Sequence, residues 1–137
     1  MLRIFILLSV VVFALAACQS KPVEKVSVDG GAYTDIDAEQ LNVMLKDKDF
    51  VLVNVHIPFE GNIAGTDLSI PYNQITDPAN LAQLPADKNA KIVLYCRSGR
   101  MSAIAAEELV KLGYTNLWNL KGGMVEWEQA GFEIQDK

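Results

Sequence analysis

The chain has 137 residues, half of them apolar, and 17 acidic side chains outnumber 12 basic ones to give a formal net charge of -5. This length is typical of one domain, and the acidic balance argues against a general nucleic-acid-binding protein, which needs a basic surface to neutralise phosphates. Two cysteines and one histidine are too few for a disulfide framework or a Cys/His zinc cluster. We therefore expect no metal site, and because of the acidic charge we expect no nucleic-acid partner.

The first 17 residues predict a signal peptide. Arg3 precedes an apolar run over residues 4–17, which is shorter than the ~20 residues that a membrane-spanning helix requires. The run ends in Leu-Ala-Ala-Cys at residues 15–18, and this tetrapeptide resembles the lipobox of bacterial lipoproteins. The resemblance implies that Cys18 is acylated and becomes the first residue of the mature protein, which anchors it to a membrane of the bacterial cell envelope. The alternatives are an uncleaved signal anchor and an ordinary secretory signal with a chance cysteine.

Two further expectations concern this anchor. Gln19 follows the cysteine where an aspartate would imply retention in the inner membrane, so we expect a periplasm-facing protein on the outer membrane if the organism has two membranes. Residues 19–32 mix charged residues with Pro and Gly and have no apolar period, so we interpret residues 18–32 as a lipidated N-terminus and flexible tether. The folded domain is then expected at residues 33–137.

From residue 33 onward the sequence predicts alternating helices and strands. Asp37 and Gln40 form a capping-box pattern before a helix at residues 38–46, and a buried strand rich in β-branched residues follows at residues 50–55. Residues 56–90 are irregular, with several prolines and glycines. The remaining elements are a strand at residues 91–95, a helix from Ser102 to the terminating Gly113 with Leu109 and Leu112 on its apolar face, a strand at residues 116–120, and a short helix that Gly122 and Gly123 open. This order predicts an α/β fold, a small parallel sheet flanked by helices on both faces.

Cys96 is the strongest candidate for a catalytic residue. It directly follows the strand at residues 91–95, and ligands bind at the carboxyl ends of strands in open α/β sheets. The loop after it can turn successive backbone N–H groups inward at the start of a helix, which binds an anion and favours a thiolate. The candidate substrate-binding residues are Arg97, Ser98, Gly99, Arg100, Met101 and Ser102. We expect Arg100 to reach across the mouth of the site and Arg97 to point toward solvent. The alternative is a buried, inert thiol.

Residues 92–132 resemble the catalytic half of the single-domain rhodaneses, which are sulfurtransferases. Two motifs carry the resemblance, CRSGR followed by Ser-Ala and LKGGMVEW. The segment VLVNVHIPFEG at residues 51–61 resembles the family's strand-and-turn motif, but Asn54 and His56 replace its usual aspartate and arginine. Met101 also stands where an arginine or threonine is common. The resemblance implies a rhodanese-like α/β fold, and the departures bear on the substrate more than on the fold.

The resemblance also implies a mechanism. The Cys96 thiolate attacks the outer sulfur of a donor such as thiosulfate, sulfite leaves, and the resulting persulfide passes its sulfur to a thiophilic acceptor. We expect this acceptor to come from outside the chain as a small thiol, cyanide or a cysteine of a partner protein, because a lipidated Cys18 leaves no second thiol. No cofactor is required, and we expect a monomer.

Two other catalytic functions do not fit the spacing of these residues. A tyrosine-phosphatase-like site needs an arginine after five intervening residues, and Ser102 occupies that position. A cysteine hydrolase of the nucleophile-elbow type needs glycines where Leu94 and Ser98 stand. We interpret His56 as an ordinary turn residue, with a proton-transfer role as the alternative, and Trp118 and Trp127 as core residues, with a partner surface as the alternative. The remaining alternative is a rhodanese-like module that binds an anion or a partner without turnover.

Overall fold

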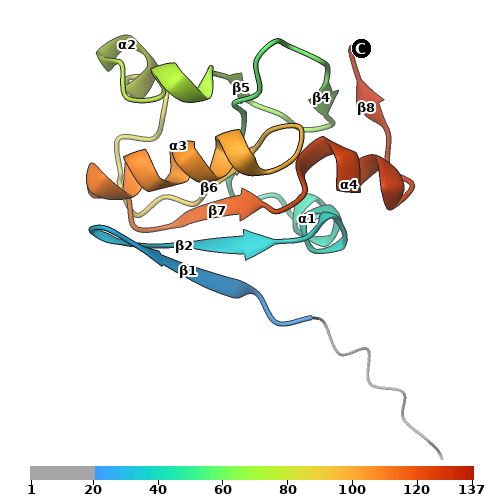
Figure 1. Cartoon of the computed structure of the whole chain (residues 1–137), viewed down its shortest axis with the longest axis horizontal. Helices are drawn as coiled ribbons and strands as arrows, with labels where there is room; N and C mark the ends of the chain where they lie inside the picture. Colours follow the sequence, from blue (N-terminus) through green and yellow to red (C-terminus); the bar gives the residue numbers. More distant parts are fainter. Residues whose placement is uncertain (1–20) are drawn as a thin grey trace, which may run out of the picture.

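The computed structural model describes residues 21–137, and the predicted signal peptide and Cys18 lie outside the described residues. Six strands form the main sheet in the order β1-β2-β7-β6-β3-β5 (Figure 1). β1 pairs antiparallel with β2, and all other neighbours pair parallel. The strands are β1 (Glu24–Val28), β2 (Gly31–Ile36), β3 (Val51–Asn54), β5 (Leu68–Ser69), β6 (Ile92–Tyr95) and β7 (Leu117–Leu120). The α/β class predicted from the sequence is confirmed.

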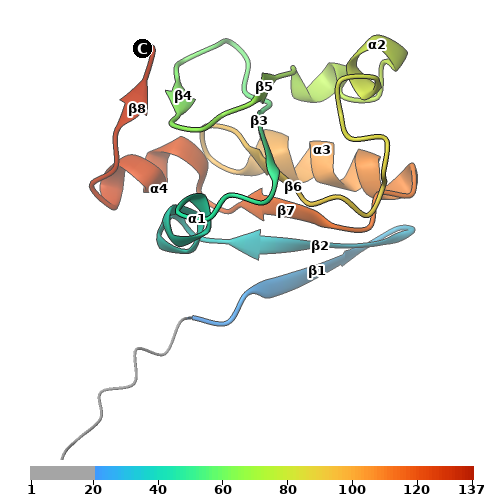
Figure 2. The same cartoon turned by 180° about the vertical axis from the view of Figure 1, so that it is seen from behind.

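Helices cover both faces of this sheet, and Figures 1 and 2 show the molecule from opposite sides. The helices are α1 (Ala38–Leu45), η1 (Tyr72–Gln74), α2 (Pro78–Leu81), α3 (Arg100–Lys111) and α4 (Gly123–Gln129). One core cluster includes buried residues of α3, and a second includes those of α1 and α4, so these helices lie on opposite faces. A separate antiparallel pair, β4 (Asn62–Ile63) and β8 (Ile134–Gln135), joins the loop after β3 to the C-terminal segment.

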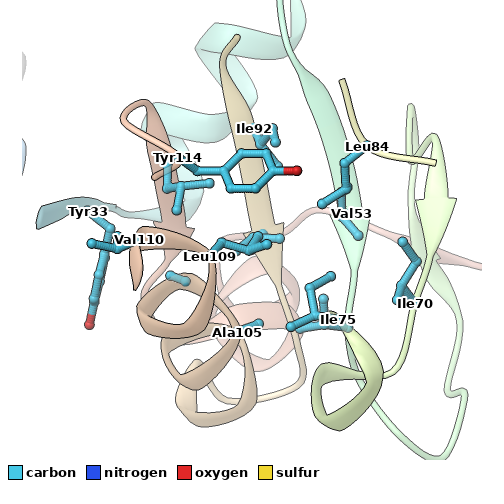
Figure 3. Packing of buried hydrophobic residues seen from close by; sticks show 14 of the residues in the cluster. Tyr33, Val53, Ile70, Ile75, Leu84, Ile92, Ala105, Leu109, Val110 and Tyr114 are labelled. Atoms are coloured by element: carbon cyan, nitrogen blue, oxygen red, sulfur yellow. The ribbon is translucent and has the colours of Figure 1, made fainter. Parts of the chain in front are cut away.

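The core explains why β6 is a continuous apolar run. All four of its residues are buried, because it has a strand on either side and helices over both faces. On one of these faces Ala105, Leu109 and Val110 of α3 pack toward the sheet (Figure 3). Leu112 was predicted on the same helical face, but it follows the end of α3 and is 38% exposed.

Two predicted helix starts have different outcomes. The capping box of α1 is confirmed, since the Gln40 N–H donates to Asp37 Oδ1 and the Asp37 N–H donates to Gln40 Oε1, both at 2.8 Å. The predicted start of the later helix at Ser102 is wrong by two residues, because α3 begins at Arg100 after Gly99. Gly99 has φ +96°, a left-handed conformation in which glycine has no steric penalty, and this turn brings the helix start closer to Cys96.

The predicted flexible tether is corrected from Glu24 onward. Residues 24–32 belong to a hairpin, in which β1 pairs with β2 from Glu24 opposite Asp35 to Val28 opposite Gly31. Val26 and Val28 alternate with polar residues and pack against the core, and Gly30 supplies the positive φ of the turn. The folded domain therefore begins about nine residues earlier than the sequence reading placed it.

Two features are absent from residues 21–137, a membrane-spanning helix and a metal-binding cluster. None of the helices in this range is long and apolar enough to cross a bilayer. Within the same range, no three His, Cys, Asp or Glu side chains come together as a group that could hold a metal ion.

Candidate active site

Cys96 lies where β6 ends, at the carboxyl edge of the central parallel strands. Its residue exposure is only 1%, and its side chain belongs to the core cluster on the α3 face. The preceding Tyr95 belongs to the cluster on the opposite face, as expected from the alternation of side chains along a strand. The end of a rigid, buried strand therefore fixes the sulfur in position.

Two donors lie close to the Cys96 sulfur. The Gly99 N–H donates to Sγ at 3.1 Å, and the Ser102 hydroxyl lies 3.4 Å from Sγ. Ser102 has no exposed surface, and its hydroxyl also lies 3.2 Å from the Gly99 carbonyl oxygen. The Ser102 hydroxyl has a single proton, so by rotating it can donate to the sulfur instead of the carbonyl oxygen when the sulfur becomes negative. Donors to a charged sulfur stabilise the thiolate and, later, an anionic persulfide.

The loop provides further donors for an anion. Within the described residues, five of its backbone N–H groups have no hydrogen-bond acceptor, those of Arg97, Ser98, Arg100, Met101 and Ser102. Three of these groups belong to the first turn of α3, where the helix dipole adds positive potential. These N–H groups are therefore free to donate to an anion, and their convergence into a cradle stays a prediction.

The start of α4 holds the catalytic loop through backbone hydrogen bonds. The Met124 N–H donates to the Cys96 carbonyl at 2.9 Å, and the Val125 N–H donates to the Arg97 carbonyl at 3.0 Å. Gly123 has φ +55°, and a Cβ built on it would lie 2.3 Å from the Cys96 carbonyl oxygen. Only glycine permits this approach, which explains physically why the GG pair of LKGGMVEW accompanies the CRSGR loop in one site.

The two arginines have different surroundings in the structure. Arg97 Nη1 lies 3.5 Å from Glu60 Oε1, and both side chains line a pocket of about 380 Å³. The other lining residues are Met124, Val125, Glu128 and Lys137. Arg100 is exposed, is absent from this lining and has no ion pair within residues 21–137. Arg97 therefore lies at this pocket, whose lining does not include Cys96, and its side chain is 62% exposed, while the expectation that Arg100 contacts the substrate stays a prediction.

The remaining loop residues divide between the surface and the core. Ser98 is exposed, whereas Met101 is partly buried and packs against the core cluster beneath α3. Met101 therefore replaces a polar residue of the family pattern by a contact with the core.

Asn54 and His56, the two departures from the family pattern, stabilise the loop that follows β3. Asn54 is 2% exposed, its Nδ2 donates to the Gly61 carbonyl at 2.9 Å, and its Oδ1 accepts the His56 N–H at 3.0 Å. His56 Nε2 lies 2.7 Å from Glu60 Oε2, and the imidazole is 8% exposed. His56 Nδ1 is buried and has no partner in the described part of the chain.

Glu60 was not identified from the sequence as a site residue. Its carboxylate contacts both His56 and Arg97, and Arg97 lies 37 residues after Glu60 in the chain. The only sequence signal is its place in the segment that resembles the strand-and-turn motif, four residues after His56. A carboxylate therefore lies at the pocket, although position 54 carries an amide.

Tyr95 shows how the opposite face is held. Its hydroxyl accepts the Ile63 N–H at 3.0 Å and lies 2.8 Å from Thr66 Oγ1. Burial raises the pKa of Tyr95 above its ordinary value of 10.0, so the phenol is neutral at physiological pH. This contact connects the strand that ends at Cys96 to the loop that carries β4.

Comparisons with known proteins agree with this site. The family model of the rhodanese-like domain matches residues 37–130. A sulfurtransferase from Allochromatium vinosum is 36% identical over 104 residues, which are 73% of this chain and 92% of that protein. A putative mitochondrial thiosulfate sulfurtransferase from Schizosaccharomyces pombe is 34% identical over 92 residues, which are 59% of this chain and 65% of that protein.

A solved structure gives the same result for the fold. The crystal structure of a rhodanese-related protein from Thermoplasma volcanium has a TM-score of 0.61 and 29% identity, and the match covers 73% of this chain and 95% of that one. The chain spans only 19% to 31% of some longer curated relatives, whose complete activities are not transferred to it. Relatives named sulfurtransferases support a sulfurtransferase-type role, and the chain belongs to the rhodanese-like domain family.

Proposed function

We propose that the protein is an envelope-anchored sulfurtransferase that moves a sulfane sulfur from thiosulfate or a similar donor to a thiophilic acceptor through a persulfide on Cys96. One observation carries the chemical part of this proposal. The Cys96 sulfur lies at the end of β6 with the Gly99 N–H at 3.1 Å and the Ser102 hydroxyl at 3.4 Å. These donors stabilise the negative sulfur both before and after the transfer.

The first half-reaction loads the cysteine. The Cys96 thiolate attacks the outer sulfur of thiosulfate, a new S–S bond forms, and the S–S bond of the donor breaks as sulfite leaves with the electron pair. The charges balance, since a monoanion and a dianion give an anionic persulfide and a sulfite dianion. We expect the N–H groups of the loop that have no acceptor within residues 21–137 to hold the sulfonate oxygens during this step.

The second half-reaction unloads the cysteine. A thiophilic acceptor, such as cyanide or a thiolate, attacks the outer sulfur of the persulfide and regenerates the Cys96 thiolate. Cys96 is the only cysteine among residues 21–137, so no neighbouring thiol in this range can resolve the persulfide. The acceptor therefore comes from outside the domain, as a small molecule or as a cysteine of a partner protein.

Thiosulfate is the donor we favour for two reasons. The loop offers several N–H donors at a helix start, which suits the sulfonate of a small anion. One relative, the protein from Schizosaccharomyces pombe, is named a putative thiosulfate sulfurtransferase.

Steady-state kinetics with thiosulfate and cyanide test this function. We expect thiocyanate to form with parallel double-reciprocal lines, which is the signature of two separate half-reactions. Cys96→Ser should abolish turnover, whereas Cys18→Ser should leave it unchanged. Binding of thiosulfate or sulfite with no thiocyanate formed from cyanide, and no persulfide or sulfide formed from a panel of thiols, would instead indicate a binding module without turnover.

The anchoring part of the proposal is tested separately. It is supported by the apolar run before Cys18 and by the lipobox-like tetrapeptide at residues 15–18. In a bacterial host the wild type should fractionate with membranes and incorporate labelled palmitate, and Cys18→Ser should do neither. Equal membrane association of both proteins would contradict lipidation at Cys18.

A further inference from the structure

The chain enters the folded domain at the same edge of the sheet that carries Cys96. Glu24 at the start of β1 pairs with Asp35, Asp35 with Asn119, and Asn119 with Leu94, so one row of the sheet runs from Glu24 to a residue two positions before Cys96. A contact between Lys121 Nζ and Glu24 Oε2 at 3.0 Å closes this edge. Figure 1 shows β1 beginning on the side toward which the arrowheads of β2 and β7 point.

The link between this edge and the proposed lipid anchor is short. Lys21 is already held by the domain, since the Gln40 Nε2 donates to its carbonyl at 2.8 Å. Cys18 is three residues from Lys21, which spans at most ~11 Å of extended chain. Cys96 lies three strands from β1, which is ~14 Å across the sheet. The hairpin that replaces most of the expected tether therefore brings the anchor point close to the catalytic edge.

Exposed apolar side chains occur in segments at the same edge. Of the five large apolar residues that are exposed among residues 21–137, three belong to such segments, Val23 at 50%, Phe59 at 53% and Val125 at 40%. Val23 also lines a pocket beside α1 together with Val43, which is 61% exposed. Val23 immediately precedes β1, Phe59 is in the loop after β3, and Val125 is in the first turn of α4. The Val125 N–H donates to Arg97, so this residue contacts the catalytic loop itself. Apolar side chains in such positions are suited to the interface of a bilayer.

We infer that the edge carrying Cys96 faces the bilayer when the chain is anchored through Cys18, with Val23, Phe59 and Val125 toward the lipid surface. This inference rests on the lipid anchor of the proposed function. It has a consequence for the sulfur acceptor, because small thiols diffuse freely to such an edge and a soluble protein approaches it with difficulty. The membrane would then favour small thiols over protein acceptors, although the isolated domain reacts with both equally.

Distance measurements on vesicles test the orientation. The full chain with Cys96→Ala, purified from membranes with its lipid, receives one cysteine for a fluorophore, at Ser98 in the catalytic loop or at Ala86 before β6. Both positions are exposed; Ser98 follows the carboxyl end of β6 and Ala86 precedes its amino end, and the four residues of the strand alone span ~13 Å. Labelled lipid headgroups in phosphatidylcholine vesicles serve as energy-transfer acceptors.

We expect stronger energy transfer from position 98 than from position 86. A variant with about 12 Gly and Ser residues inserted between Ser20 and Lys21 is the matched control, because a flexible segment of that length should largely remove the difference. Equal or reversed transfer in the uninserted chain overturns the orientation alone. A chain that does not sediment with the vesicles overturns the anchor and this inference with it, without touching the chemistry at Cys96.

A kinetic measurement gives a second readout with Cys96 restored. In vesicles, the ratio of persulfide discharge to a small thiol over discharge to reduced thioredoxin should be several-fold higher for the natural chain than for the inserted variant. The rate with the small thiol alone should be the same in both. The same ratio in both proteins contradicts an edge that is screened by the membrane.

Discussion

Replacing Gly123 by alanine tests whether α4 positions the catalytic loop. The structure places a Cβ at this position 2.3 Å from the Cys96 carbonyl oxygen and 2.6 Å from the Arg97 carbonyl, both of which are backbone atoms. Neither can rotate away, so the loop and the start of α4 must separate by roughly 1 Å, a displacement that can cost about 100-fold in rate at a catalytic site. We therefore expect Gly123→Ala to form the persulfide about 100-fold more slowly than the wild type.

Gly131→Ala is a matched control for backbone strain. Gly131 also has a positive φ, +90°, but nothing lies within 4 Å of a Cβ built there. Alanine in a left-handed conformation costs about 1 to 2 kcal/mol, so both variants should lose stability by this mechanism. Only Gly123→Ala also displaces the loop, and only that variant should lose the rate.

Stopped single-turnover reactions with thiosulfate, followed by intact mass, give the rate of loading for both variants. Thermal unfolding of the same samples gives their stability and shows which fraction is folded. A folded Gly123→Ala protein that loads Cys96 within threefold of the wild-type rate would refute the claim that α4 positions the loop. Equal slowing of Gly131→Ala would refute it as well, because strain alone would then account for the effect.

Three further predictions follow from single contacts. Ser102→Ala should slow persulfide formation about tenfold with little change in melting temperature, because it removes one donor, worth ~1.5 kcal/mol, from the negative Cys96 sulfur. Ser98→Ala is the control. Equal loading rates for these two variants would contradict the role of the Ser102 hydroxyl. Glu60→Gln should lower the KM for thiosulfate about threefold at low salt and less at high salt, because it removes the anion that partly neutralises the pocket; an unchanged KM at both salt concentrations would show that this carboxylate does not affect the donor. Burial raises the pKa of Tyr95 above 10.0, so the stability of the wild type should fall as the pH rises above 10.0. In denaturant titrations Tyr95→Phe should show a smaller fall, and it should be ~1 to 2 kcal/mol less stable than the wild type at neutral pH because it lacks the phenol's hydrogen bonds. Parallel pH profiles of the two proteins would argue against this contribution.

The parts of the fold that local sequence determines could be predicted. The apolar run of β6 followed at once by Cys96 locates a strand end and a nucleophile from adjacent residues. The capping box of α1 is also a signal within four residues, and the structure contains both of its hydrogen bonds. Local patterns of this kind need no knowledge of which distant segments meet.

The hairpin at the start of the domain was missed because two signals compete there. Lysines, a proline and two glycines give residues 19–32 the composition of a linker, although Val26 and Val28 alternate with polar residues before a turn at Gly30. The alternation is short, and its stability comes from pairing with β2 and from packing on the core. Tertiary contacts of that kind cannot be read from composition.

The arrangement of the charged residues at the site required the structure. Arg97 meets Glu60 across 37 residues of sequence, and the orientation of the arginine follows from that contact. The expected helix start at Ser102 puts Arg100 in the loop, whereas Gly99 ends the loop earlier and makes Arg100 the first residue of α3.

The central claim is that Cys96 carries the transferred sulfur, and intact mass spectrometry tests it most directly. The reduced protein is incubated with thiosulfate, freed of excess donor and measured beside a Cys96→Ala control. We predict that the wild type gains the mass of one sulfur atom, that cyanide removes this mass, and that the control never acquires it. A folded, reduced wild type that gains no sulfur from thiosulfate or from any other sulfane-sulfur donor, or a gain that persists in the control, would contradict the account.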